Sequence, residues 1–209
     1  AVDAGEKWGW SVWKRTANKN DNENAAHYVI FNNFSSQEQR DKQMKNWSME
    51  KAISMMKLGL KGKMSSRTIN NILKNGDKVK KEVRQYQIQW LDATPFVGEL
   101  KIGDKMSFAA MTQKLDDYEE YESEVWKPVF EREILRNNHR WWALTKIAKR
   151  NESAYKEPTH LVWNIGVSNG KPFVEDDDFM SKAMRSEKMR DEYRNMSNAN
   201  ELTLIYKTN

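Results

Sequence analysis

Few side chains in this chain could carry acid–base or metal chemistry. The 209 residues include three histidines and no cysteine, which excludes disulfides, thiolate metal sites and cysteine nucleophiles. The histidines, His27, His139 and His160, show no H-E-x-x-H pattern or other metal-ligand spacing, so we expect no metal site. An imidazole titrates near neutral pH, and His160 is therefore a candidate general base. The alternative is a surface or hydrogen-bonded structural histidine.

Aromatic residues and asparagines could instead form a binding pocket. The chain has nine tryptophans, many for its length. Trp10, Tyr28 and Trp142 could wall a pocket for a flat or apolar ligand, with Asn32 and Asn164 as its polar groups. The alternative is that the aromatic residues are ordinary core and that the asparagines hydrogen-bond at strand ends.

Acidic runs occur at Asp116–Glu124 and Glu175–Asp178. Neither has the alternating acids and the glycine of an EF-hand loop. Both lie where a helix should begin, and acids there complement the helix dipole. The sequence also lacks the G-x-S-x-G, Walker A and G-x-G-x-x-G patterns, so hydrolase, P-loop and Rossmann chemistry have no support.

The elements that must position these residues can be read from hydrophobic periodicity. Strand-like alternation predicts strands over 8–16, 27–34, 83–91, 106–115, 140–149, 159–167 and 201–207. Helical spacing predicts helices over 37–58, 66–74, about 116–137 and from about 176 onward. Pro128 falls inside the third helix, where proline costs ~3 kcal/mol, so we expect a bend near Glu124–Pro128.

An internal repeat organises these elements. The segment Trp10–Asn32 recurs as Trp142–Asn164 at a constant offset of 132 residues, with no gap across the hairpin. The second half reads β-α-β-β-α-β, the order of the ferredoxin-like fold, and the first half reads β-β-α-β. We therefore predict an α+β fold of two ferredoxin-like repeats with antiparallel sheets. The first half is 1–92, the linker 93–105 and the second half 106–209.

The first repeat lacks its leading strand and helix. We expect the missing elements to precede Ala1 in a longer chain. Without them a sheet edge would be exposed and would need a partner, and a homodimer is one way to supply it. Because the chain starts with Ala1 and not Met, a processed exported protein and a cytoplasmic protein both remain open.

Two ferredoxin-like repeats in one chain resemble the dimeric α/β-barrel superfamily, which includes antibiotic-biosynthesis-type monooxygenases and chlorite-dismutase-like haem proteins. The resemblance rests on element order, covers nearly the whole chain and implies a pocket between a sheet and its helices. In small haem-degrading barrels an asparagine, a tryptophan and a histidine line the haem pocket, and Asn164, Trp142 and His160 are a loosely similar set. We predict no cofactor, with haem as the alternative that this resemblance implies.

The net charge of +5 is concentrated in Lys57–Arg84, which holds nine of the 35 basic residues. Such a patch could bind an anionic polymer or membrane, although a solvated helix face is the simpler explanation. No stretch of 18 apolar residues predicts a membrane span. The strand segments lack the Lys/Arg-Gly-aromatic run of RNA-recognition domains, so nucleic acid is not an expected partner.

The sequence therefore favours a protein that binds a small apolar or aromatic ligand in a sheet–helix pocket, with a cofactor-poor oxygenase or isomerase activity as one form of this function. A non-catalytic interaction or assembly module that uses sheet edges is the second alternative. An anionic-polymer binder that uses Lys57–Arg84 is the third.

Overall fold

The computed structural model of the chain describes residues 2, 5–19, 21–167 and 189–208. The helix expected from about residue 176 therefore lies mostly outside the described residues. The chain forms two compact units. The first unit comprises Ala1–Val12, Ile30–Val83 and Tyr206–Asn209, and the second comprises Trp13–Val29 and Arg84–Ile205. The boundary expected at 93–105 stays a prediction.

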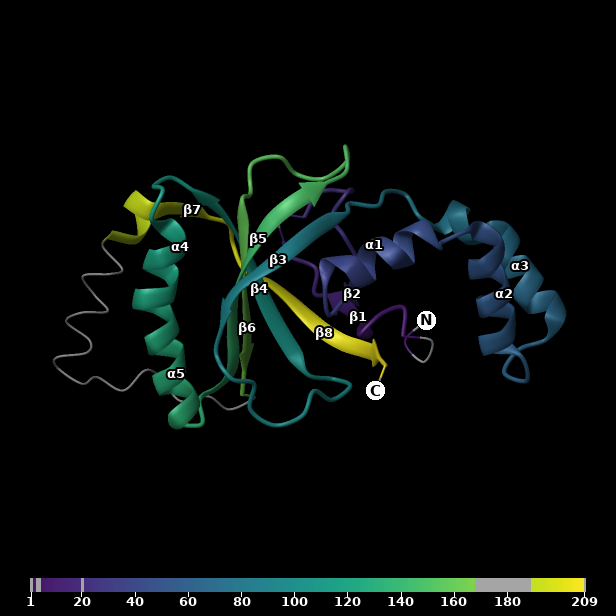
Figure 1. The fold of residues 1–209 in the computed structure, drawn as a ribbon, viewed down its shortest axis with the longest axis horizontal. Coiled ribbons are helices and arrows are strands. Elements are labelled where there is room, and N and C mark those ends of the chain that lie inside the picture. The colour runs from purple at the N-terminus through teal and green to yellow at the C-terminus, as the bar shows by residue number, and fades with distance from the viewer. Residues whose placement is uncertain (1, 3–4, 20, 168–188, 209) are drawn as a thin grey trace. The chain divides into compact units, whose positions relative to one another are not determined.

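An antiparallel sheet forms the centre of the second unit (Figure 1). Its strands lie in the order β8-β4-β6-β5-β3, and the short strand β7 pairs with β4. The bounds are β3 Tyr86–Ala93, β4 Lys105–Gln113, β5 His139–Arg150, β6 His160–Gly166, β7 Arg194–Met196 and β8 Asn200–Lys207. The α+β fold with an antiparallel sheet is thus confirmed.

A broken helix covers one face of this sheet (Figure 1). It consists of α4 (Tyr118–Tyr121), a π-helical turn η2 (Glu122–Trp126) and α5 (Lys127–Leu135). Pro128 lies in the first turn of α5, where its missing N–H costs nothing. A π-helical turn lies directly before α5, at the place where a bend is expected.

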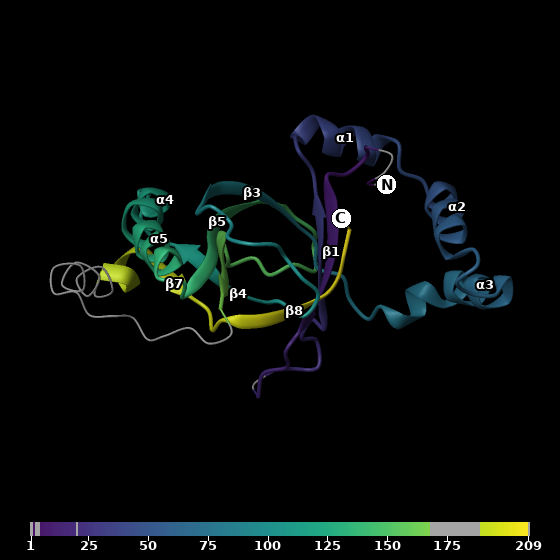
Figure 2. The same ribbon diagram turned by 90° about the horizontal axis from the view of Figure 1, so that it is seen from below.

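Both faces of the sheet are buried, because the sheet curls (Figure 2). The face under the helices forms a core cluster with Tyr118 and Tyr121 of α4. Its buried strand residues are Ala109, Met111, Trp142, Leu144 and Val162. The opposite face buries a second set, which includes Met106, Trp163, Ile165, Leu202 and Leu204. Both sets are large and apolar, so the curled sheet holds two layers of core.

The two hairpins of the chain share one register. β1 (Gly9–Arg15) and β2 (Tyr28–Asn33) form the first hairpin, and β5 and β6 form the second. The Arg15 N–H donates to the His27 carbonyl at 2.9 Å, and the Ile147 N–H donates to the Thr159 carbonyl at 2.8 Å. Both partners of the second bond lie 132 residues after those of the first, the same offset as in the sequence.

A second hydrogen-bond pattern also occurs twice. The Thr94 N–H donates to the Trp142 carbonyl at 3.0 Å, and the Thr94 hydroxyl accepts from the Trp142 N–H at 3.0 Å. Thr208 makes the same two bonds to Trp10, at 2.9 and 3.0 Å. Thr94 follows β3, and Thr208 follows β8.

The first unit contains most of the remaining helical structure. Its helices are α1 (Gln37–Lys45), α2 (Met49–Leu60), α3 (Ser66–Asn75) and the 3-10 helix η1 (Gly76–Val79). The expected helix over 37–58 is therefore two helices, because Ser48 leaves helical geometry and caps α2 by accepting from the Lys51 N–H. Likewise the Ser36 hydroxyl caps α1 by accepting from the Gln39 N–H. Among the described residues, no helix is long and apolar enough to span a membrane.

Candidate functional site

The layer between the sheet of the second unit and α4–η2–α5 is the candidate site. Two groups of polar side chains are buried in it among apolar residues. One group surrounds Trp142 and Asn164, and the other surrounds Glu122 and Arg194. Tyr118 and Trp142 belong to the same core cluster, so one continuous apolar layer joins the two groups.

Trp142 and Asn164 are direct neighbours across β5 and β6. Directly opposed residues of an antiparallel pair share a face, and Trp142 faces the helices, where Phe130 of α5 lies against it with a centroid distance of 5.9 Å. Trp142 is fully buried. Its Nε1 makes no hydrogen bond to a described residue, and the Asn164 Oδ1 lacks a well-formed one, although the Asn164 side chain interacts with His139. Buried polar groups are nearly always paired, so these two need an explanation.

His139 lies beside this pair and was not singled out by the sequence. Its ring centroid lies 4.9 Å from that of Phe130. Burial lowers the pKa of His139, although the neighbouring Asn164 side chain acts in the opposite direction. Its Nε2 is also buried without a well-formed hydrogen bond within the described chain. A donor and acceptor set of this kind matches a ligand that carries a carbonyl or hydroxyl group.

His160 is fully buried and fully bonded. Its Nδ1 lies 2.8 Å from the Thr159 hydroxyl, and its Nε2 lies 3.1 Å from Glu119 Oε1. An ionised carboxylate can only accept, so Nε2 donates to Glu119 and Nδ1 accepts from Thr159. Burial lowers the pKa of His160, which keeps the ring neutral. These bonds give His160 a structural role at the base of the core cluster.

The other three residues predicted from the sequence are not part of this layer, and two of them, Trp10 and Asn32, belong to the first unit. Trp10 is half-buried and packs edge-on against Tyr206 at 5.1 Å. Asn32 is exposed and accepts a hydrogen bond from Lys7. Tyr28 is 55% exposed. The structure therefore brings Trp142, Asn164 and His160 to one sheet face and leaves Trp10, Tyr28 and Asn32 outside the site.

The second group is centred on a buried ion pair. Glu122 Oε1 lies 2.9 Å from Arg194 Nε, and the two side chains are only 1% and 6% exposed. The Arg194 Nε–H is directed at Met111 Sδ, at 3.3 Å. As a result Glu122 Oε1 and Arg194 Nη1 lack well-formed hydrogen bonds in the part of the chain that the structure describes. Glu122 and Arg194 thus form an ion pair, but some of their polar atoms lack a well-formed hydrogen bond.

Glu122 is a carboxyl group that titrates near neutral pH. Burial raises its pKa to about 7, although Arg194 and Tyr118 act in the opposite direction. Burial also raises the pKa of Tyr118, and the charge of Glu122 adds to this effect. The Arg194 guanidinium lies 5.6 Å from the centroid of the Trp126 ring. A carboxyl group with a pKa near the working pH is suited to accept and return a proton.

Sequence reasoning missed Glu122, because the run Asp116–Glu124 suggested only a helix start. The available signal was spacing: Glu122 follows Tyr118 by four residues and precedes Val125 by three, so it lies on the apolar side of the helix. Its backbone belongs to the π-helical turn, a feature that is frequent at functional sites.

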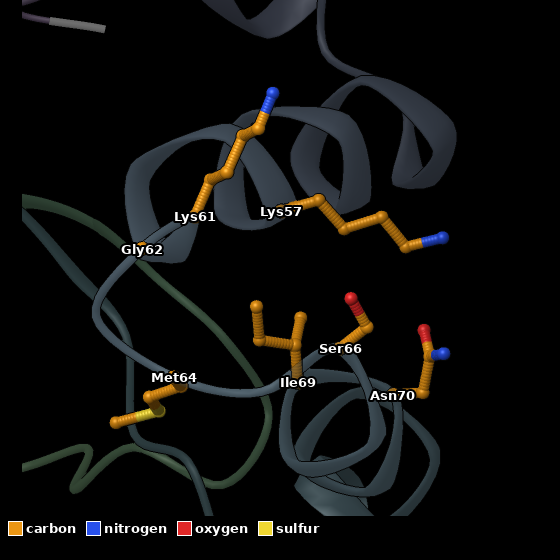
Figure 3. Close-up of a pocket in the computed structure, with 7 residues that line it drawn as sticks. All are labelled: Lys57, Lys61, Gly62, Met64, Ser66, Ile69 and Asn70. Carbon is orange, nitrogen blue, oxygen red and sulfur yellow. The ribbon is translucent and has the colours of Figure 1, made fainter.

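Two pockets lie elsewhere, in the first unit. One has a volume of about 340 Å³ and is lined by Lys57, Lys61, Gly62, Met64, Ser66, Ile69 and Asn70 (Figure 3). The other has a volume of about 210 Å³ and lies around Trp47. Neither includes a residue predicted for the sheet–helix pocket, whereas the first lies within the basic segment Lys57–Arg84.

The described residues contain no group of three side chains that could hold a metal ion. The haem alternative can be tested on His160. An axial histidine needs a free ring nitrogen, and both nitrogens of His160 are engaged by Thr159 and Glu119. His160 therefore does not fit a haem ligand.

No protein-family model and no curated protein match the chain. Two solved structures are similar to it in fold. One is an anthrone oxidase-like protein, with 13% identity and a TM-score of 0.55 over 99% of this chain and 81% of that chain. The other is a candidate monooxygenase from Fusobacterium nucleatum subsp. nucleatum, with 10% identity and a TM-score of 0.53 over 96% of this chain and 77% of that chain. At these identities the likeness shows the fold alone.

Proposed function

We propose that the second unit binds a small aromatic molecule between its sheet and α4–η2–α5 and oxidises it with molecular oxygen, without a bound cofactor. The observation that carries this proposal is the buried Glu122 carboxyl, which has a pKa of about 7 and lies in an apolar layer with incompletely bonded neighbours. The names of the two structural neighbours, an anthrone oxidase-like protein and a candidate monooxygenase, agree with this chemistry.

In the proposed reaction Glu122 acts as a general base on a ring methylene that is conjugated with a carbonyl through the adjoining aromatic rings. The carboxylate takes one methylene proton, and the electron pair of that C–H bond forms a new C–O bond to O₂. The proton returns from Glu122 to the outer oxygen and gives a hydroperoxide. The hydroperoxide then loses the second methylene hydrogen and its outer OH as water. The net change is CH₂ plus O₂ to C=O plus H₂O, so no external reductant is needed.

The remaining side chains of the site hold the ligand and its charge. The Trp142 Nε1–H can donate to the ligand carbonyl as negative charge develops on it, a form of stabilisation that is large in a dry site. Asn164 Oδ1 can accept from a ligand hydroxyl. Arg194 keeps a positive charge next to Glu122 and so favours the ionised base. The first two roles use Trp142 Nε1 and Asn164 Oδ1, which lack a well-formed hydrogen bond among the described residues.

We also propose that the two halves are related repeats, as the sequence predicts. The shared hairpin register of Arg15–His27 and Ile147–Thr159 supports this view. The paired threonine–tryptophan bonds support it independently, because they join the last strand of each half to the hairpin of the other. The proposed site belongs to the second half, where α4–η2–α5 cover the sheet face.

Oxygen uptake with anthrone as the probe tests the activity, with anthraquinone as the expected product. We expect Glu122→Gln to lower the rate by about 10²-fold or more, as is typical for loss of a general base. Glu120→Gln is the matched control, since Glu120 is an exposed acid of the same helix and should not change the rate. If Glu122→Gln oxidises anthrone as fast as the parent protein, the proposed base is wrong.

A further inference from the structure

The turn between α2 and α3 carries both exposed apolar side chains and basic side chains. We refer to residues 57–67 as the α2–α3 tip. Leu58 is 74% exposed and Met64 is 45% exposed. The tip also carries four cations, which are Lys57, Lys61, Lys63 and Arg67, and no acidic residue. The proposed oxidation uses none of these side chains.

The helix that leads into the tip is amphipathic, and its charged residues lie outside a broad apolar side. Met49, Ile53 and Leu60 lie along one side of α2, at spacings of four and seven residues, and Leu58 lies on the opposite side. None of the 12 residues of α2 is buried in the described structure. An amphipathic helix normally buries its apolar side against a core or at a membrane interface. Within the described part of the chain, α3 buries only Ile69, so the apolar residues of α2 stay at least partly exposed.

The pocket at the tip adds a polar recess (Figure 3). In Figure 3 the Lys57 ammonium group extends along the side of the pocket on which the Ser66 hydroxyl and the Asn70 amide lie, with Ile69 beside them, while Lys61 points away. Ser66 opens α3, whose first turn contains no acidic residue. The cation and the two neutral polar groups suit the oxygens of a phosphate.

We propose that the α2–α3 tip docks this protein on the surface of an anionic phospholipid bilayer. Leu58 and Met64 would enter the boundary of the acyl chains, and the four cations would lie at the level of the phosphates, the arrangement by which amphipathic segments bind at an interface. Charge complementarity points to the occupant: exposed Leu58 and Met64 together suit an apolar phase, and the surrounding cations suit anions. Nucleic acid would satisfy only the second requirement, and a second copy of this basic tip would satisfy only the first.

Vesicle flotation tests the proposal with the full chain. One set of vesicles is phosphatidylcholine alone, and the other contains about 30% phosphatidylglycerol, a fraction typical of anionic surfaces. We expect flotation with the anionic vesicles and little with the neutral ones. Equal recovery with both sets, or recovery with neither, would overturn the proposal.

Two variants with matched controls assign the binding to the tip. Leu58→Ser should lower the partition coefficient by about tenfold, because a leucine side chain is lost from the apolar phase. Leu135→Ser, at a leucine 85% exposed at the end of α5, should leave it unchanged. Lys61→Ala should lower it by about fivefold, whereas Lys149→Ala, at an exposed lysine of β5, should not.

Further measurements separate the other occupants. If Leu58→Ser floats as well as the parent protein while circular dichroism shows an intact fold, the apolar contact is absent and the proposal fails. Sedimentation without vesicles reports a second copy: self-association that Leu58→Ser abolishes would overturn the bilayer as occupant. Retention on single-stranded DNA that anionic vesicles do not compete away would overturn it in favour of nucleic acid.

Discussion

Thr94 holds the backbone of Trp142 at two points, because its N–H donates to the Trp142 carbonyl at 3.0 Å while its hydroxyl accepts from the Trp142 N–H, also at 3.0 Å. Thr94 and Trp142 are 4% and 0% exposed. This clamp fixes the strand position from which the Trp142 indole enters the sheet–helix layer. Thr208 repeats the clamp on Trp10.

We expect Thr94→Val to destabilise the protein. Valine keeps the shape of threonine but leaves the buried Trp142 N–H without an acceptor, which costs about 1–3 kcal/mol. Thr208→Val is the matched change in the second clamp and should cost less, because Thr208 is only half-buried. Urea unfolding followed by circular dichroism measures both. Equal losses for the two variants would show that burial does not set the strength of the clamp.

The rate of ligand oxidation should depend on the ionisation of Glu122. Burial raises the pKa of Glu122 to about 7, and a general base must be ionised. We therefore expect kcat/KM to fall as the pH drops below about 7. Glu122→Gln should remove this acidic limb from its residual activity. Persistence of the limb in the variant would assign the titration to another group.

Asn164→Leu should separate ligand binding from stability. The Asn164 Oδ1 is buried without a well-formed hydrogen bond to a described residue and interacts with His139, so its removal relieves a poorly satisfied group. We expect the free energy of unfolding to stay the same or to rise, while ligand affinity falls by about tenfold. Asn32→Leu, at the equivalent exposed position of the first hairpin, should leave affinity unchanged. Calorimetric titration and thermal unfolding provide the two readouts.

The stability of the protein should decline in mild acid because of His160. Burial lowers the pKa of His160 below its ordinary value of 6.5, although Glu119 opposes the shift, so the unfolded chain takes up this proton more readily than the folded chain. The free energy of unfolding is then largest above pH 6.5 and decreases as the pH falls through the folded pKa. His160→Gln should reduce this slope, and His27→Gln, at an exposed histidine, should not. Parallel slopes for the parent and both variants would contradict this assignment.

Local patterns in the sequence predicted much of the fold. The offset of 132 predicted the hairpin register that Arg15 and Ile147 share, since register follows from strand alternation and loop length. The break between α1 and α2 at Ser48 was missed, because the apolar residues keep helical spacing on both sides of Ser48 and hide its capping preference. The short strand β7 was also missed, since three residues show no periodicity.

The candidate site was harder to predict, because its polar groups come from distant parts of the chain. Trp142 and Asn164 were found through the repeat, and the structure makes them neighbours. No sequence pattern indicated His139 or Arg194, since their roles depend on which residues the folded sheet brings beside them. Glu122 looked like one acid among several, and only burial distinguishes its chemistry from that of the exposed Glu120.

Because Glu122 lies in the π-helical turn Glu122–Trp126, the direction of its side chain depends on the number of residues in this turn as well as on the residue type. Each residue of an α-helix turns the chain by about 100°, so deleting one residue from this turn would rotate α4 relative to α5 by about that angle. Tyr118 and the acid would then leave the sheet while α5 stayed in place. A deletion of a single codon could thus abolish the proton acceptor without altering one side chain of the site.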